Sequence, residues 1–389
     1  MLRIKTLILI LPFVLLSFTV SAYFDKGADP RYLNFLKAYN EFVKQYADVS
    51  WPKVPSGKKT GEGDTDPRVP ILRERLHGEG LLKKPASGDV FDHELSQALM
   101  EFQGRNGILD DGVLGKFTVT QLNISPQERI CQMRIGLKRL SDILPRISSD
   151  RYVVVNIPDY MARLYINGNV EWESRAIVGR LDRKTPPLND EIEYIVFSPK
   201  WRVPVKIAVE DKIPEIQKDP DFLKKMGMKV YARENGELIE TDPATIDWGE
   251  LNKDNFDYLI VQDAGGGNAL GRIKFMFPNK DDVYLHDTPT KKLFESMTRT
   301  FSSGCIRIQR PVELAEIVLK DKEGWDRERI EKEMHRKNER FLNLDEHIPI
   351  SVVYLTSWVD DDGDLEFRRD IYSYDRQMKR GLCADLNVK

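Results

Sequence analysis

Two residues in the C-terminal half of this 389-residue chain have the side chains needed for covalent catalysis. His286 ends a strand-like segment, and Cys305 follows a Ser-Ser-Gly turn further along. An imidazole can take the proton of a neighbouring thiol and leave a reactive thiolate. Because Gly304 has no Cβ, the N–H groups of Gly304 and Cys305 could approach a bound carbonyl as oxyanion donors. Arg307 could pair with a substrate carboxylate in bidentate fashion.

Each of these residues also has a plainer interpretation. A single cysteine is more often a small buried apolar residue than a nucleophile, and a single histidine is usually structural. Metal binding is a third interpretation, but the sequence contains no Cys-x-x-Cys or His-x-x-x-His spacing. The residue types alone therefore leave catalysis and packing open, and we expect no metal or cofactor.

The neighbours of His286 follow from strand alternation. Tyr284 lies two residues earlier and shares the face of His286, where it either lines the pocket or packs as an aromatic residue. Asp287 belongs to the opposite face, so we expect a backbone carbonyl, and not this carboxylate, to fix the tautomer of His286.

Composition and charge place the chain among globular proteins. It is 41% hydrophobic and 31% charged, and 59 basic against 62 acidic residues give a net charge of −3. Without a run of Lys and Arg, we expect no nucleic-acid partner. Residues 1–22 combine basic residues, a short apolar run and the small residues Ser21 and Ala22, which predicts a cleaved signal peptide. The run is too short to span a membrane, so we expect an exported protein without stable membrane insertion.

Changes in hydrophobic periodicity divide the rest of the chain. Residues 23–65 predict an arm with one helix and a polar linker, residues 66–123 a compact three-helix module, and residues 124–150 a connecting helix. Asp92 is a predicted N-cap within the module. From Arg151 onward, β-branched runs and turns such as Asn167-Gly168 predict a mostly β domain. Inside it, residues 201–256 are polar and helix-leaning, which is typical of a functional insertion.

The stretch from His286 through Ser302-Ser303-Gly304-Cys305-Ile306-Arg307 resembles the active-site signature of the L,D-transpeptidases, the cysteine enzymes of peptidoglycan. Ser303 stands where many members have His, and the larger periplasmic branch, which makes cross-links, shares that Ser. The helical module resembles the common peptidoglycan-binding domain at Phe102-Gln103, Gly107, Asp111-Gly112, Gly115 and Thr118.

This resemblance implies a multidomain α+β protein. Residues 66–123 would be the peptidoglycan-binding domain, and residues 151–320 the catalytic domain. Residues 201–256, which begin with Trp201-Arg202-Val203-Pro204, would be a helical capping insertion. A C-terminal helix and β-hairpin in residues 321–389 would complete the catalytic domain.

The resemblance also implies an activity in the periplasm. Cys305 would attack a stem tetrapeptide between its diamino-acid residue and the terminal D-Ala, with His286 as the base, and a second stem would take the acyl group as acceptor. Glycan-strand synthases would be further partners. The residues suggested for substrate contact are Arg307, Tyr284, Ser303, Asn268 and Trp201.

Three alternatives stay open at the level of sequence. Water could replace the amine acceptor, which would make the protein an L,D-endopeptidase or carboxypeptidase. A lipoprotein could be the acceptor, or the chain could be a non-enzymatic wall-binding protein with an inert thiol. The sequence also does not decide whether Cys131 and Cys383 form a disulfide, which exported proteins can do.

Overall fold

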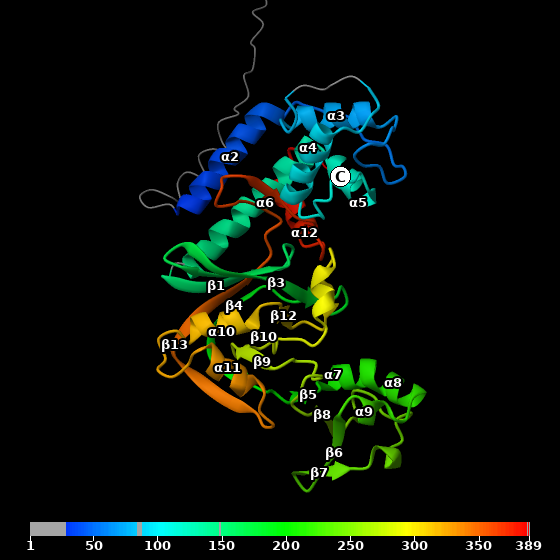
Figure 1. The fold of residues 1–389 in the computed structure, drawn as a ribbon, viewed down its shortest axis with the longest axis vertical. Helices are drawn as coiled ribbons and strands as arrows, with labels where there is room; N and C mark the ends of the chain where they lie inside the picture. Colours follow the sequence, from blue (N-terminus) through cyan, green and yellow to red (C-terminus); the bar gives the residue numbers. More distant parts are fainter. Residues whose placement is uncertain (1–28, 84–87, 148, 387, 389) are drawn as a thin grey trace, which may run out of the picture.

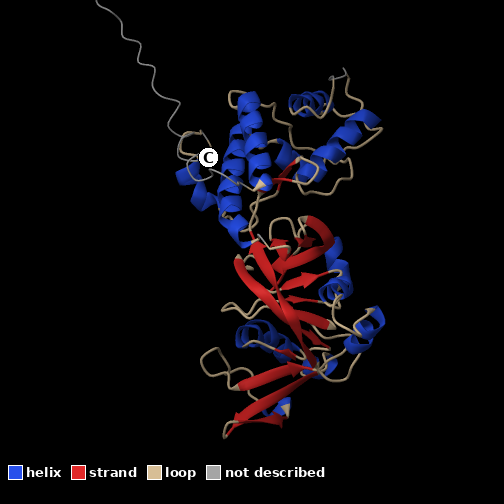
Figure 2. Ribbon diagram, turned by 90° about the vertical axis from the view of Figure 1, so that its left-hand side faces the viewer, coloured by secondary structure: helices blue, strands red, loops and turns tan. Residues whose placement is uncertain are grey.

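The computed structural model describes the chain apart from residues 1–28, 84–87, 148, 387 and 389. The predicted signal peptide, residues 1–22, therefore lies outside the described residues. A helical region occupies one end of the molecule, a β domain the middle and a smaller α/β unit the other end (Figure 1). Figure 2 shows the same separation of helices from strands. The predicted multidomain α+β class is confirmed.

The helical region contains the predicted three-helix module. The helices α3 (Val69–Gly78), α4 (His93–Arg105) and α5 (Lys116–Leu122) enclose an apolar core. Asp92 caps α4 as predicted, because its carboxylate accepts a hydrogen bond of 2.9 Å from the N–H of Leu95. The connecting helix is α6 (Pro126–Ile143), which is followed by the short η1 (Leu144–Arg146).

The segment expected to be an arm and linker is packed into this region, which corrects the prediction. The helix α2 (Pro30–Tyr46) lies along α6 and buries aromatic side chains against it. Val54 is 1% exposed, and its backbone N–H and C=O both bond to the side chain of Asn123, at 2.8 and 2.9 Å. Buried apolar residues within a polar stretch thus attach it to the module.

The β domain is built on one closed sheet. Among the described residues, nine strands follow the order β11-β3-β12-β10-β9-β4-β13-β1-β2, and β2 also pairs with β3 and so closes the sheet. Their bounds are β1 (Arg151–Asn156), β2 (Met161–Ile166), β3 (Asn169–Gly179), β4 (Leu188–Phe197), β9 (Ile273–Met276), β10 (Leu285–His286), β11 (Thr300–Ser302), β12 (Ile306–Ile308) and β13 (Arg340–Val353). The helices α10 (Pro311–Val318) and α11 (Arg327–Met334) share its core. The short η4 (Lys291–Glu295) lies between β10 and β11.

The insertion, which we call the cap (residues 201–262), differs from the prediction because it contains a sheet. Its strands β5 (Trp201–Arg202), β8 (Tyr258–Gln262), β6 (Met228–Glu234) and β7 (Glu237–Thr241) pair in that order. The cap also holds α7 (Val205–Ile207), the π-helical turn η2 (Ala208–Lys212), α8 (Ile213–Lys218), α9 (Phe222–Lys225) and η3 (Pro243–Thr245). The turn from β6 to β7 is Asn235-Gly236, with φ of 50° and 88°. An Asn-Gly pair of the same kind, Asn167-Gly168, predicted the hairpin between β2 and β3.

The C-terminal segment returns to the helical region, which corrects the expected domain boundary. β13 completes the closed sheet, but the following hairpin of β14 (Ser357–Val359) and β15 (Leu365–Phe367) packs against α6 and α2. The last helix, α12 (Asp375–Leu382), also lies against α6, where Cys131 and Cys383 form a disulfide with a Cα–Cα distance of 5.5 Å. The question left open by the sequence is therefore answered in favour of pairing.

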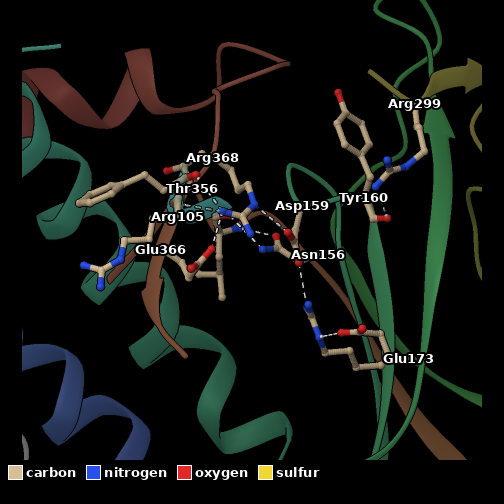
Figure 3. A network of polar contacts seen from close by, with 12 residues as sticks. Arg105, Asn156, Asp159, Tyr160, Glu173, Arg299, Thr356, Glu366 and Arg368 are labelled. Carbon is tan, nitrogen blue, oxygen red and sulfur yellow. Dashed lines mark hydrogen bonds and ion pairs between the residues drawn. The ribbon is translucent and has the colours of Figure 1, made fainter. Parts of the chain in front are cut away.

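A network of charged groups joins the helical region to the β domain (Figure 3). Arg368 donates to the carboxylate of Asp159 at 2.7 Å and to the backbone oxygen of Arg105, at the end of α4, at 3.3 Å. Arg368 also pairs with Glu366 at 2.6 Å, and Arg163 approaches the other oxygen of Asp159 at 2.8 Å. Since Asp159 is 7% exposed, this pairing satisfies a buried carboxylate at the joint.

Candidate active site

The sheet brings the residues suggested for catalysis to one place. β10 and β12 are adjacent and parallel, with His286 opposite Arg307 in the register. Cys305 immediately precedes β12, and the N–H of Ile306 bonds to the carbonyl of Tyr284 at 3.1 Å. The thiol, the imidazole, the phenol and the guanidinium therefore come from two neighbouring strands and the turn that leads into one of them.

His286 is held as a neutral imidazole with one defined tautomer. Its Nδ1 lies 2.6 Å from the backbone oxygen of Asp287, as expected of a carbonyl partner. A carbonyl can only accept, so Nδ1 carries the proton of the neutral ring and Nε2 is unprotonated, with the backbone of Leu270 as a second hydrogen-bonding neighbour of the ring. Burial, together with the positive charges of Arg307 and Lys274, lowers the pKa of His286 to about 3. The ring is thus uncharged at neutral pH.

The carboxylate of Asp287 serves the neighbouring loop. It accepts a hydrogen bond of 2.9 Å from the backbone N–H of Arg272 and forms an ion pair with Lys291. Gly271 lies directly against it, with φ of 64°. Asp287 therefore orients His286 through its backbone and fixes the loop through its side chain.

Cys305 is a half-buried thiol in a protonated resting state. Its Sγ lies 3.5 Å from the carbonyl oxygen of Asp282. Burial raises the pKa of the thiol, while contacts with Tyr284 and the positive charges of Arg307 and Lys274 oppose the shift. No hydrogen bond joins the thiol to the ring of His286 in the described part of the chain. Such bonds are often long in sites without substrate.

The two expected oxyanion donors, the N–H groups of Gly304 and Cys305, differ in their surroundings. The N–H of Gly304 donates to the hydroxyl of Ser302 at 3.2 Å, and this hydroxyl in turn donates to the carbonyl of Cys305. For the N–H of Cys305 we find no partner among the described residues. This amide could meet a substrate oxygen without giving up another bond, and the oxyanion role of both amides stays a prediction.

Arg307 and Tyr284 occupy positions suited to substrate. The buried Nε of Arg307 has no hydrogen-bond partner among the described residues, and no ion pair is formed by its guanidinium group there. The ring of Tyr284 lies 5.6 Å from that of His286, so the two share a face as expected. An unpaired, partly desolvated cation beside the thiol can accept an anionic group of a ligand.

Asn268 does not have the role expected from sequence. It is 1% exposed, and its amide nitrogen donates to the carbonyls of Pro199, Gln262 and Asp263 at 3.1, 3.2 and 2.9 Å. Its oxygen accepts from the N–H of Leu270 at 2.8 Å. With these atoms occupied, Asn268 holds the loop between β8 and β9 and does not face a ligand.

The other two suggested contacts, Trp201 and Ser303, lie at the border of the cap. Trp201 packs partly against the cap's own core, with Nζ of Lys212 5.2 Å from its ring centre. The hydroxyl of Ser303 accepts a hydrogen bond of 3.1 Å from Arg183. A contact of either residue with substrate stays a prediction.

Sequence reasoning missed Lys274 as a site residue. It lies on β9 directly opposite His286 in the antiparallel register. Its Nζ stands 5.1 Å from the ring centre of Tyr284, and burial lowers its pKa. The signal was available, because a lysine between the apolar residues Ile273 and Phe275 must occupy the face opposite to theirs.

The described residues offer no site for a metal and no membrane span. No group of three or more His, Cys, Asp or Glu side chains is placed to hold an ion among them. No helix in the same residues is long and apolar enough to cross a bilayer.

Comparison with known proteins now adds independent information. Residues 150–330 match the family described as "L,D-transpeptidase catalytic domain", and residues 65–122 match the one described as "Putative peptidoglycan binding domain". Residues 150–330 belong to the L,D-transpeptidase catalytic domain family. The histidine, the cysteine and the whole cap lie inside this domain.

A relative and two solved structures complete the comparison. The chain is 35% identical over 235 residues to a Haemophilus influenzae protein named "Putative L,D-transpeptidase"; the match covers 60% of this chain and 46% of that protein. A solved L,D-transpeptidase from Xylanimonas cellulosilytica is 14% identical, with a TM-score of 0.24 over 77% of this chain and 98% of its own. One from Stackebrandtia nassauensis is 12% identical, with a TM-score of 0.29 over 77% and 96%. Scores this low carry no argument, and the assignment depends on the sequence matches.

Proposed function

We propose that this protein forms peptidoglycan cross-links by L,D-transpeptidation through a thioester on Cys305. The observation that carries the proposal is the placement of His286 on β10 and of Cys305 immediately before the neighbouring parallel strand β12, with Nδ1 of His286 bonded to a carbonyl. This arrangement leaves Nε2 as the proton acceptor in the strand next to the thiol. The match of residues 150–330 to the L,D-transpeptidase catalytic domain supports the same chemistry.

In the first half-reaction, Sγ of Cys305 attacks the carbonyl of the third, diamino-acid residue of a stem tetrapeptide. Nε2 of His286 takes the thiol proton and delivers it to the departing amine as the C–N bond breaks. D-Alanine leaves, and the acyl group remains on sulfur as a thioester. The N–H of Cys305 stabilises the oxygen that becomes negative on the way.

In the second half-reaction, the side-chain amine of another stem attacks the thioester. His286 now takes the proton of this amine and returns it to the leaving sulfur, so the enzyme is restored. The product is an amide that links two diamino-acid residues. The two steps share one acyl-enzyme, which is the ping-pong logic of covalent catalysis.

The charges around the thiol suit a donor that ends in a carboxylate. Arg307 and Lys274 lie beside Cys305, and neither forms an ion pair with another described residue. The terminal D-Ala of a tetrapeptide carries its carboxylate one residue beyond the scissile bond. We assign Arg307 and Lys274 to this carboxylate.

The helical region is proposed to hold the protein on its polymeric substrate outside the cytoplasmic membrane. A hollow of about 620 Å³ lies beside α4 and is lined by Leu81, Leu82, Lys83, Gln97 and Gly104, among others. We assign it to a peptidoglycan segment. The disulfide between Cys131 and Cys383 supports an oxidising compartment such as the periplasm.

The test is to incubate the purified protein with disaccharide-tetrapeptide and to separate the products by mass. Cross-linked dimers that have lost one alanine are expected, and Cys305→Ala should lower their rate of formation roughly 10⁴-fold or more. Circular dichroism and melting temperature should be unchanged in the variant, because Cys305 lies in a half-buried turn. Trimmed monomers in place of dimers would identify water as the acceptor, and normal turnover by Cys305→Ala would end the proposal.

A further inference from the structure

Arg183 lies where three separate segments of the chain meet. It belongs to the loop between β3 and β4, yet its side chain contacts the cap on one side and the turn that carries Cys305 on the other. Toward the cap, it donates to Asp211 at 2.8 Å and to Glu210, both in the π-helical turn η2. Toward the catalytic turn, Nη1 donates to the hydroxyl of Ser303 at 3.1 Å.

The guanidinium of Arg183 is buried, whereas the carboxylates of Glu210 and Asp211 are partly exposed. Arg183 is only 7% exposed, and its Nε has no hydrogen-bond partner in the described part of the chain. Burial works against its charged form, but the hydrogen bonds to Asp211 and Glu210 outweigh burial and raise the pKa of Arg183. An arginine buried in this way is strongly destabilising if its partners are removed. The loop therefore prefers the state in which the cap is in place.

The loop that carries Arg183 is also tied to the backbone beside the nucleophile. Thr185 accepts a hydrogen bond from the N–H of Gly179 at 2.8 Å and donates to the carbonyl of Gly304 at 2.7 Å. The N–H of Arg180 donates to the carbonyl of Ser302 at 3.0 Å. A Cβ on Gly179 would come within 2.2 Å of the backbone oxygen of Arg183, so the glycine permits this close path. A displacement of the loop would thus also move the carbonyl of Gly304 and the N–H of Cys305, which belong to the same peptide group.

The short side chain at position 303 fits this arrangement. Many L,D-transpeptidases have His there, whereas here a hydroxyl receives the guanidinium of Arg183 from outside the turn. The cation beside the catalytic turn therefore comes from the loop between β3 and β4, and the same guanidinium also contacts the cap.

We propose that Arg183, Glu210, Asp211 and Ser303 act as a clasp that couples the position of the cap to the position of the nucleophile. This inference rests on the function proposed above. In it, Arg183 is a positioning residue: it holds η2 of the cap against the loop between β3 and β4 and, through Ser303 and Thr185, keeps Cys305 in its reactive place. Breaking the clasp from the cap side should therefore change the chemistry of a thiol that the cap carboxylates do not touch.

The experiment compares Arg183→Gln, the cap-side double variant Glu210→Gln/Asp211→Asn and the triple variant that combines them. Three measurements are made on each: deuterium uptake of residues 205–218 and 300–306, the rate of Cys305 alkylation by iodoacetamide, and kcat and KM for D-alanine release from the tetrapeptide. Lys253→Met is the matched control, because Lys253 pairs with the same Glu210 but belongs to the cap itself.

We expect Arg183→Gln and the cap-side variant each to raise deuterium uptake in both segments and to lower kcat/KM roughly tenfold. The triple variant should be no worse than the cap-side variant, because Asp211→Asn also breaks the ion pair of Asp211 with Arg180, which Arg183→Gln leaves intact. Lys253→Met should behave as wild type, and Arg183→Lys should recover part of the loss because it keeps the charge.

Two results would overturn the clasp. One is a cap-side variant whose cap exchanges faster while Cys305 alkylation and kcat/KM stay within about twofold of wild type. The other is a triple variant in which the separate losses multiply. Alkylation and deuterium uptake need no peptidoglycan, so they decide the clasp even if wild-type protein releases no D-alanine, an outcome that would refute only the proposed function.

Discussion

The thiol of Cys305 is subject to two opposing influences. Burial raises its pKa, and the cations Arg307 and Lys274 favour the thiolate. In the absence of substrate, the first influence prevails, so most of the sulfur is protonated at neutral pH. In the reaction proposed above, the proton must then leave during the attack itself, with the neutral His286 as its acceptor.

Replacing Lys274 by Met tests this balance. Removing the cation destabilises the thiolate and leaves the thiol unaffected, so the midpoint of the pH dependence of alkylation by iodoacetamide should move upward by roughly 0.5–1 unit. In wild type, this midpoint should already lie above that of a free cysteine, about 8.5. The exposed Lys320 supplies the control, Lys320→Met. A midpoint that is unchanged or lower in Lys274→Met would contradict the assignment of Lys274 to the site.

Asp287 could orient His286 in two ways, through its backbone carbonyl or through its side-chain carboxylate. In the structure, the carbonyl of Asp287 contacts Nδ1 of His286, and its carboxylate accepts a hydrogen bond from the N–H of Arg272 in the neighbouring loop. Asp287→Asn keeps the carbonyl and can still accept from the loop, so we expect D-alanine release within about tenfold of wild type, far above Cys305→Ala. If Asp287→Asn lost as much D-alanine release as Cys305→Ala, the carboxylate itself would act on the imidazole.

Among the elements, the loop between β8 and β9 connects the cap to the histidine. Asn268 ties its backbone together, and Gly271 lies against Asp287 with φ of 64°. A Cβ on Gly271 would come within 2.3 Å of the carboxylate. We therefore predict that Gly271→Ala lowers the free energy of unfolding by about 1–3 kcal/mol and also lowers kcat for D-alanine release, because Asp287 and with it His286 must shift.

Gly267→Ala is the matched control for this loop. Its Cβ would meet no atom within 4 Å, and its φ is not positive, so both unfolding in urea and turnover should match wild type. If Gly271→Ala unfolds at the same urea concentration as Gly267→Ala, the loop does not position the histidine in the way described here.

Sequence predicted elements whose signals are local. Three predictions that depend only on neighbouring residues agree with the structure. They are the hairpin at Asn167-Gly168, the N-cap of α4 at Asp92 and a backbone carbonyl as the partner of His286. The hairpin at Asn235-Gly236 carried the same local signal, but its strands were missed because charged residues such as Arg233 and Glu234 obscure their alternation.

Other features could not be predicted because they depend on contacts between distant segments. The occupied amide of Gly304 depends on the rotamer of Ser302, and the clasp joins Arg183 to two segments that come 27 and 120 residues later in the chain. The boundary at the C-terminus was misplaced for the same reason, since nothing near residues 357–382 indicates that they pack on α6.

At the scale of the whole molecule, the disulfide fastens the C-terminus to the helical region. Cys131 and Cys383 are 252 residues apart, and both are buried. Closing so long a loop restricts the unfolded chain, so Cys131→Ala/Cys383→Ala should lower the free energy of unfolding by about 2–4 kcal/mol. Turnover at 25 °C should stay near wild type, because Cys305 lies in the β domain. Thiol counting after denaturation should give one free thiol in wild type, and three would contradict the pairing.

The hollow beside α4 allows wall binding to be separated from catalysis. Gly104 lines it, and a Cβ there would meet no atom within 4 Å, so Gly104→Trp can fill the hollow without disturbing α4. We predict that this variant loses most of its co-sedimentation with purified sacculi but releases D-alanine from a soluble tetrapeptide at the wild-type rate. Gly381→Trp, at an equally open helical glycine in α12, should keep both properties. Because Arg368 joins the helical region to the β domain, a protein bound through this hollow presents Cys305 to the wall in a fixed orientation. Unchanged co-sedimentation of Gly104→Trp would place the wall-binding surface elsewhere and remove the basis for that orientation.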